Sequence, residues 1–518
     1  MLTVLNTRCR RHVLPMDSPV FPLEPMISLN ASRSVFRLLC WLCLLVCPIA
    51  AQPAESRDFS GFWTGTVRHE QSVYDIGFEF RRDADGRWLG RQWYAVLHQM
   101  GTPMGVLAET PGGLRHGGAG LELHFTPEGI EGVINGQDPL TLRRCEALPA
   151  SASVPVYPAG PRADWTCSLG APVWGSPTVC EDGVAVADAQ GRVHLLELGT
   201  GASRWVRETG AAIHGDVLFV KGSAYVYNDA GRCFRLCAGT GEIIWQRELG
   251  GGAVVRHPPA ESEYSYDYRG ATPVLADGTL YVTSADGTLW ALNAESGTTR
   301  WQVRVGGLVR TRVAVTGDLL VVTTWAGEVL ALGRVDGAVR WRFASREAFT
   351  ADPVVVGDAV FVSSRDSKLY RLRLGDGLVD WTYYHAGSWV ESAPRVVDEL
   401  GFIGSSDLRL VRAFAPETGA PVWEIDVLGW SWGTPAVSDD LVFAGAAGAV
   451  RYPISMEGGL VALDRATGKP RWRVAIGAMP GAFATGVVGS PVVAGPRVIC
   501  AGLDGVVYAF PVVKAARD

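Results

Sequence analysis

Tryptophan recurs at near-constant spacing through most of the chain, and this repeat constrains the fold more than any other feature. The successive gaps are 40, 40, 56, 40, 40, 42 and 49 residues. A period of about 40 residues is the length of one four-stranded propeller blade, and the longer gaps indicate insertions in the same unit. The recurring residues are Trp165, Trp205, Trp245, Trp301, Trp341, Trp381, Trp423 and Trp472.

The two ends of the repeat region each supply part of one blade. Trp165 lies on an expected outer strand with no blade strands before it, whereas three expected inner strands in residues 490–510 lack a fourth. Pairing the strand around Trp165 with the strand around Tyr508 would complete the ring and remove open sheet edges. The sequence therefore predicts an all-β fold: an eight-bladed β-propeller over residues 164–518, closed by its terminal strands.

Residues 52–144 precede the repeats and predict a separate small β domain. Stretches such as residues 76–80 alternate apolar and polar side chains between Gly-containing turns, which is typical of antiparallel strands. The opening Gly61-Phe62-Trp63-Thr64-Gly65 resembles the G-x-W-x-G start of small lipocalin-like barrels. Trp63 then either plugs a filled barrel or closes one that holds a small ligand. Residues 145–163, rich in Pro and Ala, predict a semi-extended linker.

The first 51 residues are typical of a targeting segment. Arg33 and Arg37 precede an apolar run that ends at Ala51 and is shorter than the roughly 20 residues that span a bilayer. We expect an export signal, with Met26 as a candidate true start. The protein is then periplasmic or held in the envelope of a bacterium. Membrane association is expected only through this segment, if it stays uncleaved or becomes lipidated.

Charge and cysteine spacing exclude several functional classes. The net charge is −6 and no basic cluster stands out, so nucleic acid is not an expected partner. The only C-x-x-C pair, Cys40 and Cys43, lies in the targeting segment, so zinc binding and haem attachment have no support. The six cysteines beyond it permit disulfides without requiring any.

A docking motif points to a known family. Residues 462–472 read Ala-Leu-Asp-Arg-Ala-Thr-Gly-Lys-Pro-Arg-Trp and match the A-x-D-x-x-T-G-x-x-x-W motif of quinoprotein-type propellers at every fixed position. Partial copies precede most of the other recurring tryptophans. The chain is identified as a member of the pyrroloquinoline-quinone-like repeat superfamily, closer to the non-enzymatic BamB-type branch than to the dehydrogenases. The resemblance implies that the recurring indoles pack between neighbouring blades and are structural.

The superfamily contains both enzymes and non-enzymatic scaffolds, so the resemblance alone does not distinguish these two classes. The dehydrogenase branch typically has adjacent cysteines over the quinone and Glu, Asn and Asp ligands for calcium, yet no Cys-Cys pair and no matching segment occurs here. We therefore expect no cofactor and no catalysis, and a module that binds a protein or peptide in the envelope. The alternatives are a divergent alcohol or sugar dehydrogenase using pyrroloquinoline quinone and Ca²⁺, and small-ligand carriage by the N-terminal barrel.

Loop positions indicate where a partner would bind. Strands alternate direction, so loops between blades open on the same face as loops between second and third strands. Both long insertions, residues 250–271 and 446–459, fall on that face. Aromatic and Arg-rich loops suit a protein-binding surface, although they could instead only seal the channel end. Glu391 is the most plausible ligand for a cation, but lacks an evident acidic partner. The expected partner-binding residues are Tyr264, Tyr266, Tyr268, Arg269, Trp389, Trp430, Trp432, Arg451 and Tyr452.

Overall fold

The computed structural model describes residues 58–69, 72–148, 154–181, 183–256, 267–449, 452 and 454–512. The expected export segment, with its candidate start at Met26, lies outside the described residues. So do three candidate partner residues, Tyr264, Tyr266 and Arg451. Within the described ranges the regular structure is almost entirely strand, and the single helical element is a 3-10 turn, η1 (Ala95–Leu97).

The N-terminal domain is a closed antiparallel barrel in which β8 returns to pair with β1. Phe78 and Phe80 are fully buried inside it, within a cluster of apolar side chains. Trp63 is 3% exposed, donates from Nε1 to the carbonyl of Phe59 at 2.8 Å, and lies under the guanidinium of Arg144. Of the two interpretations of Trp63, the one in which it closes a filled barrel describes this domain. Its strands are β1 (Gly61–His69), β2 (Ser72–Arg82), β3 (Trp88–Tyr94), β4 (Gln99–Thr110), β5 (Gly113–His116), β6 (Leu121–Thr126), β7 (Gly129–Ile134) and β8 (Asp138–Cys145).

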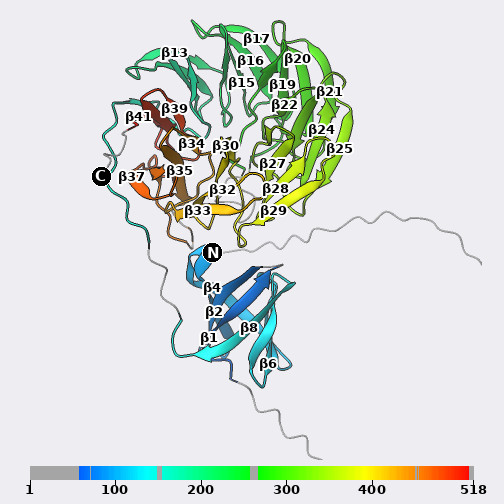
Figure 1. Cartoon of the computed structure of the whole chain (residues 1–518), viewed down its shortest axis with the longest axis vertical. Helices are drawn as coiled ribbons and strands as arrows, with labels where there is room; N and C mark the ends of the chain where they lie inside the picture. Colours follow the sequence, from blue (N-terminus) through cyan, green and yellow to red (C-terminus); the bar gives the residue numbers. More distant parts are fainter. Residues whose placement is uncertain are drawn as a thin grey trace, which may run out of the picture. The chain divides into compact units, whose positions relative to one another are not determined.

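Eight antiparallel sheets then form the propeller, and Figure 1 shows them arranged as blades around one axis. First strands of neighbouring blades contact one another, as β10 contacts β14 and β39 and as β22 contacts β26, so these strands lie innermost. The inner strands are β10 (Thr178–Cys180), β14 (Leu218–Val220), β18 (Val274–Ala276), β22 (Ala314–Thr316), β26 (Val354–Val356), β30 (Arg395–Val397), β34 (Ala436–Val437) and β39 (Val492–Ala494).

The two middle strands of each blade are rich in Val, Leu and Ala and are buried on both faces, because every blade packs between two others. The second strands are β11 (Gly183–Ala187), β15 (Ser223–Tyr227), β19 (Thr279–Ser284), β23 (Leu319–Thr323), β27 (Ala359–Ser363), β31 (Leu400–Gly404), β35 (Leu441–Ala449) and β40 (Arg497–Ala501). The third strands are β12 (Arg192–Glu197), β16 (Arg232–Cys237), β20 (Thr288–Asn293), β24 (Glu328–Gly333), β28 (Lys368–Arg373), β32 (Leu410–Phe414), β36 (Gly459–Asp464) and β41 (Val506–Pro511).

The outer strands alternate exposed and half-buried residues and carry the recurring tryptophans. They are β13 (Ser203–Glu208), β17 (Ile243–Glu248), β21 (Thr299–Arg304), β25 (Val339–Ala344), β29 (Val379–Tyr384), β33 (Pro421–Asp426), β37 (Pro470–Ala475) and β9 (Trp165–Ser168). A further strand, β38 (Ala484–Gly486), pairs with the end of β35.

The predicted closure of the ring is confirmed. The N-terminal strand β9 pairs with the C-terminal strand β41, with Trp165 opposite Ala509 and Ser168 opposite Val506. One blade is therefore built from both ends of the repeat region, and β9 supplies the fourth strand that its sheet would otherwise lack.

Most of the recurring indoles dock on the next blade in one way. Nε1 donates to a carbonyl in the turn between the third and fourth strands of that blade, as Trp341 does to Leu374 at 2.7 Å. A positive-φ glycine of the same turn lies against the indole. The other donor–acceptor pairs are Trp165–Leu198, Trp205–Ala238, Trp245–Ala294, Trp381–Pro416 and Trp423–Arg465.

Trp472 departs from this pattern for a topological reason. The next blade is the one made from both chain ends, so the chain never forms a turn between its third strand β41 and outer strand β9. Nε1 of Trp472 accordingly has no hydrogen-bond partner. Gly160, from the segment before β9, takes the glycine's place against the indole: a Cβ there would lie 3.1 Å from the Trp472 ring.

The second half of the expected linker packs on the propeller. Ala159 forms a parallel bridge with Arg473, and the N–H of Gly160 donates to the Arg473 carbonyl at 2.8 Å. The hydroxyl of Tyr157 donates to the carbonyl of Asp426 at 2.6 Å. This stretch is extended, as its prolines predict, and it covers the indole that lacks a turn.

A pair of glycines tests the docking contact. Gly377 and Gly357 both have positive φ, but a Cβ at Gly377 would lie 2.4 Å from the Trp341 ring, whereas at Gly357 nothing lies within 4 Å. Gly357→Ala should therefore cost about 1 kcal/mol of unfolding free energy, from backbone strain alone. Gly377→Ala should cost about 2–4 kcal/mol because it also displaces the indole. Urea unfolding followed by tryptophan fluorescence measures both, and equal costs would contradict the docking role of the turn.

Candidate functional site

The blades approach one another most closely just before their inner strands. A Cβ at Gly489 would lie 2.2 Å from the carbonyl oxygen of Gly175, and one at Gly215 would lie 2.4 Å from that of Ala271. Only small residues fit at this position in each blade. They are Gly175, Gly215, Ala271, Thr311, Ala351, Ser392, Gly433 and Gly489.

The residue that follows each small one lies closest to the channel, and together these form what we name the axial ring. One residue comes from each blade: Ser176, Asp216, Thr272, Arg312, Asp352, Ala393, Thr434 and Ser490. Five of the six side chains that can accept take a hydrogen bond from the backbone N–H of the ring residue in the preceding blade. The bonds are Ser176 to Asp216, Asp216 to Thr272, Arg312 to Asp352, Thr434 to Ser490 and Ser490 to Ser176.

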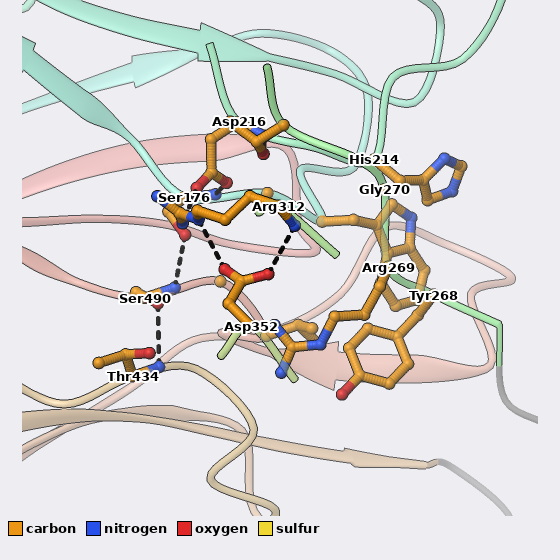
Figure 2. A pocket seen from close by; sticks show the side chains of 15 residues that line it. Ser176, His214, Asp216, Tyr268, Arg269, Gly270, Arg312, Asp352, Thr434 and Ser490 are labelled. Atoms are coloured by element: carbon orange, nitrogen blue, oxygen red, sulfur yellow. Dashed lines mark hydrogen bonds and ion pairs between the residues drawn. The ribbon is translucent and has the colours of Figure 1, made fainter. Parts of the chain in front are cut away.

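Arg312 reaches across the channel within this ring. Its Nε lies 2.6 Å from Asp352 of the next blade, and its Nη2 lies 2.9 Å from Asp216, two blades away in the other direction (Figure 2). The Asp352 carboxylate is the main reason that the pKa of Arg312 is raised. Arg312, Asp352 and Asp216 form an ion triad that divides the channel into two parts. We name the two ends of the channel by the loops that they carry. The insertion face carries the described parts of the two insertions, residues 250–256, 267–271, 446–449, 452 and 454–459, and the turn face carries the tight turns at the far ends of the inner strands.

On the insertion face the channel is closed around a buried carboxylate. Glu391 is fully buried and accepts hydrogen bonds from Tyr268 Oη at 2.9 Å, Thr350 Oγ1 at 2.7 Å and Arg365 Nε at 2.6 Å. Burial alone would raise the pKa of Glu391. Arg365 and Arg269, with these hydrogen bonds, outweigh that effect and hold its pKa below the ordinary value.

Stacked aromatic rings complete this closure. Tyr268 stacks on Trp432 with centroids 4.5 Å apart, and Trp432 stacks on Trp430 at the same distance. The indole of Trp430 donates to Asp407 Oδ1 at 2.9 Å, and Tyr452 donates to Asp407 Oδ2 at 2.8 Å. Burial raises the pKa of Asp407, although both hydrogen bonds oppose this. We name these residues, with Glu391, Thr350, Arg365 and Arg269, the plug.

Cations hold the plug to the surrounding loops. The Arg365 guanidinium lies between the rings of Trp325 and Trp389, at 4.6 and 4.4 Å from their centroids. Arg269 donates to the backbone carbonyls of Trp432 and Glu391, which tie the end of one insertion to two other blades. The plug is therefore bonded to several blades at once.

The neck of the first insertion is clamped by a second ionic cluster. Arg256 donates to Asp229 Oδ1 at 2.6 Å and to the backbone carbonyls of Asp267 and Arg269. Arg310, 4% exposed, lies 2.7 Å from Asp267. The guanidinium of Arg256 thus binds Asp267, and these two residues stand on either side of the part that is not described.

Between the plug and the axial ring remains a chamber of about 30 Å³ (Figure 2). That is room for about one water molecule. Trp174, His214 and Tyr268 line it on one side, with Asp216 and Arg312 of the axial ring on the other. Burial, followed by Arg256, lowers the pKa of His214 despite the neighbouring Asp229.

These observations correct the expectation that the insertion-face aromatics stand on an exposed rim. Tyr268, Trp430 and Trp432 are 4%, 2% and 3% exposed, because they stack on one another inside the plug. For these three the sealing interpretation applies. Arg269, Trp389 and Tyr452 are half-buried. Glu391, the carboxylate considered for a cation, is bonded to two arginines through its side chain and backbone.

On the turn face the channel widens into a funnel of about 820 Å³, lined by the inner strands. Its narrow end is the axial ring and its walls are mainly proline and valine, among them Pro177, Pro353 and Val356. The sequence-based choice of residues missed both the ring and the funnel. A signal was present about once per repeat: a small residue, then a polar residue in every blade but the one with Ala393, and often a proline precede the inner strand.

Three general findings concern the described part of the chain. It contains no group of three or more His, Cys, Asp and Glu placed to hold a metal ion. Its helical structure includes no segment with the length and hydropathy needed to cross a membrane. The six described cysteines are all free thiols, so the disulfides that their number permits do not form among them.

The architecture defines a class, the eight-bladed propellers with tryptophan-docked repeats. Within that class, a family profile described as outer membrane protein assembly factor BamB matches residues 158–267, 189–310, 306–410 and 407–517. The chain belongs to this family. A search of curated protein sequences finds no match.

Solved structures show the same fold at low identity. BamB from Moraxella catarrhalis is 19% identical with a TM-score of 0.53, and the match covers 70% of this chain and all of that one. A quinohemoprotein alcohol dehydrogenase from Comamonas testosteroni is 14% identical with a TM-score of 0.50, covering 68% of this chain and 77% of that one. A europium-containing methanol dehydrogenase is 14% identical with a TM-score of 0.54, covering 68% and 93%.

The two dehydrogenases share this fold, so the insertion-face end of the channel is a place where a quinone would have to fit. Ligand pockets enclose roughly 300–1,000 Å³, whereas the chamber here measures about 30 Å³. Tyr268, Trp432 and Trp430 fill the space beside it with their own stacked rings. The residues at this end therefore do not leave the room that a fused three-ring quinone needs.

The plug predicts a stability difference between two glutamates. Glu391→Gln should cost about 3–5 kcal/mol, because it leaves the buried Arg365 charge without its carboxylate. Glu417→Gln, which removes the exposed partner of a pair with Arg371, should cause no resolvable change, because Asp380 still pairs with that arginine. Since the folded pKa of Glu391 lies below its unfolded value, its contribution holds above the ordinary glutamate range and is lost as the pH falls through the folded value. Urea unfolding at neutral and acidic pH measures this, and equal behaviour of the two variants would contradict the buried ion pair.

Proposed function

We propose that this protein is a non-enzymatic, exported propeller that binds a protein or peptide partner, or scaffolds a complex, in the bacterial cell envelope. Membership of the BamB family supports the class of function, because the matched repeats span the whole propeller. The observation that carries the proposal is the filled plug. Because the plug fills the channel end that carries both insertions, this end offers a partner a surface and not a pocket.

The insertion face is the proposed contact surface. Arg269 and Tyr452 belong to the plug, and Trp389 lies against its Arg365. These three residues are half-buried and held in place, so a partner would meet a pre-organised surface. Val255, at the clamped neck of the first insertion, is 73% exposed. Aromatic and arginine side chains with an apolar neighbour match the composition of protein interfaces. The proposed export and any membrane association depend on the N-terminal segment alone.

A pair of exposed valines tests this surface. Val255→Glu places a charge on the insertion face, whereas Val335→Glu, in a turn on the opposite face and 84% exposed, adds the same charge elsewhere. We expect proteins captured from envelope extracts by the wild type and by Val335→Glu to be lost with Val255→Glu, because a buried charge opposes association. Melting curves should show all three proteins equally folded. Identical captured sets for both variants would refute the surface.

The alternative is a divergent quinone-dependent alcohol or sugar dehydrogenase, which the fold likeness to the two dehydrogenases motivates. Adding pyrroloquinoline quinone and Ca²⁺ to the purified protein and following dye reduction with alcohols and sugars separates the two. The scaffold proposal expects no reduction above the rate with protein omitted. Substrate-dependent reduction would replace it with the enzyme.

A further inference from the structure

We propose that the funnel on the turn face binds an extended peptide segment that carries lysine or arginine side chains. The inference goes beyond the proposed function, because it concerns the opposite face of the propeller and a site that the insertions do not touch. It stands if no partner binds the insertion face.

The funnel has the size and shape of a ligand-binding pocket. The funnel encloses about 820 Å³, within the roughly 300–1,000 Å³ that ligand pockets occupy. It runs from the axial ring to the ends of the inner strands, from Asp352 at its base to Val356 at its mouth. Valine and proline are the commonest side chains on its walls, and the aliphatic stems of long side chains can pack against them. An extended segment entering end-on along the axis suits this shape.

The backbone of the funnel offers more acceptors than donors. Each inner strand ends its sheet, so one edge of its backbone is unpaired within the blade. Five of the lining residues are prolines, which contribute a carbonyl group and no N–H. They are Pro177, Pro353, Pro394, Pro435 and Pro491. Lysine ammonium and arginine guanidinium groups are donors only, and therefore match such a lining.

The charge around the mouth is acidic. Among the described residues, the turns that join the first and second strands of the blades contain eight Asp or Glu residues and one lysine, Lys221. Arginines pair with three of these carboxylates, in Arg334–Asp277, Arg371–Asp358 and Arg465–Asp398. The exposed Asp439 and Asp440 line a hollow of about 490 Å³ beside β34 and β39 on the same face.

Within the funnel itself the charges balance. Asp216 and Asp352 at the base are offset by Arg312, and the exposed Arg395 stands on the wall. The turn carboxylates therefore set the sign of the potential at the mouth, and apolar walls focus that potential inward. A cationic segment is attracted, whereas an acidic one meets repulsion before it reaches the apolar walls.

The test uses the full-length protein and three fluorescein-labelled hexapeptides of alternating Lys–Val, Glu–Val and Ser–Val. We expect fluorescence anisotropy to show saturable binding of the Lys–Val peptide, at least about tenfold tighter than either of the others. Raising the salt concentration should weaken it, because the mouth carboxylates become screened.

Two matched variants locate the binding. Val356→Lys places an ammonium group at the mouth, where Val356 is 41% exposed, and should weaken Lys–Val binding by about tenfold. Val335→Lys adds the same charge in an outer turn of the same face and should leave the affinity within about twofold. Melting curves should show that both variants fold as the wild type does.

The proposal is overturned by any of four results. Lys–Val binding could be undetectable, or Glu–Val could bind equally well. Ser–Val could bind as tightly as Lys–Val, which would make the funnel an apolar groove without charge selection. Equal weakening by Val356→Lys and Val335→Lys would assign the attraction to the acidic surface and not to the funnel.

Discussion

The contact between an outer-strand indole and the glycine turn of the next blade sets the geometry of this propeller. The indole spans the gap between two sheets, its N–H satisfies a turn carbonyl, and a glycine with positive φ lets the backbone lie against the ring. Repetition of this contact fixes the angle between successive blades. The ring closes after eight blades, and the chain completes its last sheet with strands from both ends.

Crowding at the axis follows from the same geometry. Where the blades converge, Gly175, Gly215, Gly433 and Gly489 approach neighbouring backbones too closely for a side chain. The next residue of each blade then meets its counterparts, and backbone N–H groups bond to side chains around the ring. The two ends of the channel differ because insertions exist on one face only. Aromatic and ionic side chains from the insertions and from neighbouring loops fill that end, whereas short turns leave the other end open.

Much of this architecture was accessible from the sequence, because it repeats. Tryptophan spacing predicted the blades, and the incomplete blades around Trp165 and Tyr508 predicted the closure, which the pairing of β9 with β41 confirms. The exception at Trp472 also follows from topology, since a blade built from two chain ends lacks one turn.

The candidate site was less accessible. Tyr268 comes from the first insertion, whereas Trp430 and Trp432 lie in one loop between blades, so the stack depends on a contact between Tyr268 and Trp432, which are far apart in the sequence. Aromatic composition alone does not distinguish an exposed rim from a filled plug. The axial ring, in contrast, recurs once per blade. Its small-polar-proline pattern is a periodic signal that composition-based reasoning about the loops passed over.

Ring closure is the claim on which the plug, the axial ring and the funnel all depend, and removal of residues 504–518 tests it most directly. That truncation deletes β41, the strand that joins β9 to the last blade. Size-exclusion chromatography with light scattering and a melting curve should show loss of the folded monomer, because the exposed sheet edges and the uncovered core associate. A truncated protein that stays monomeric and melts at the temperature of the full chain would contradict the account.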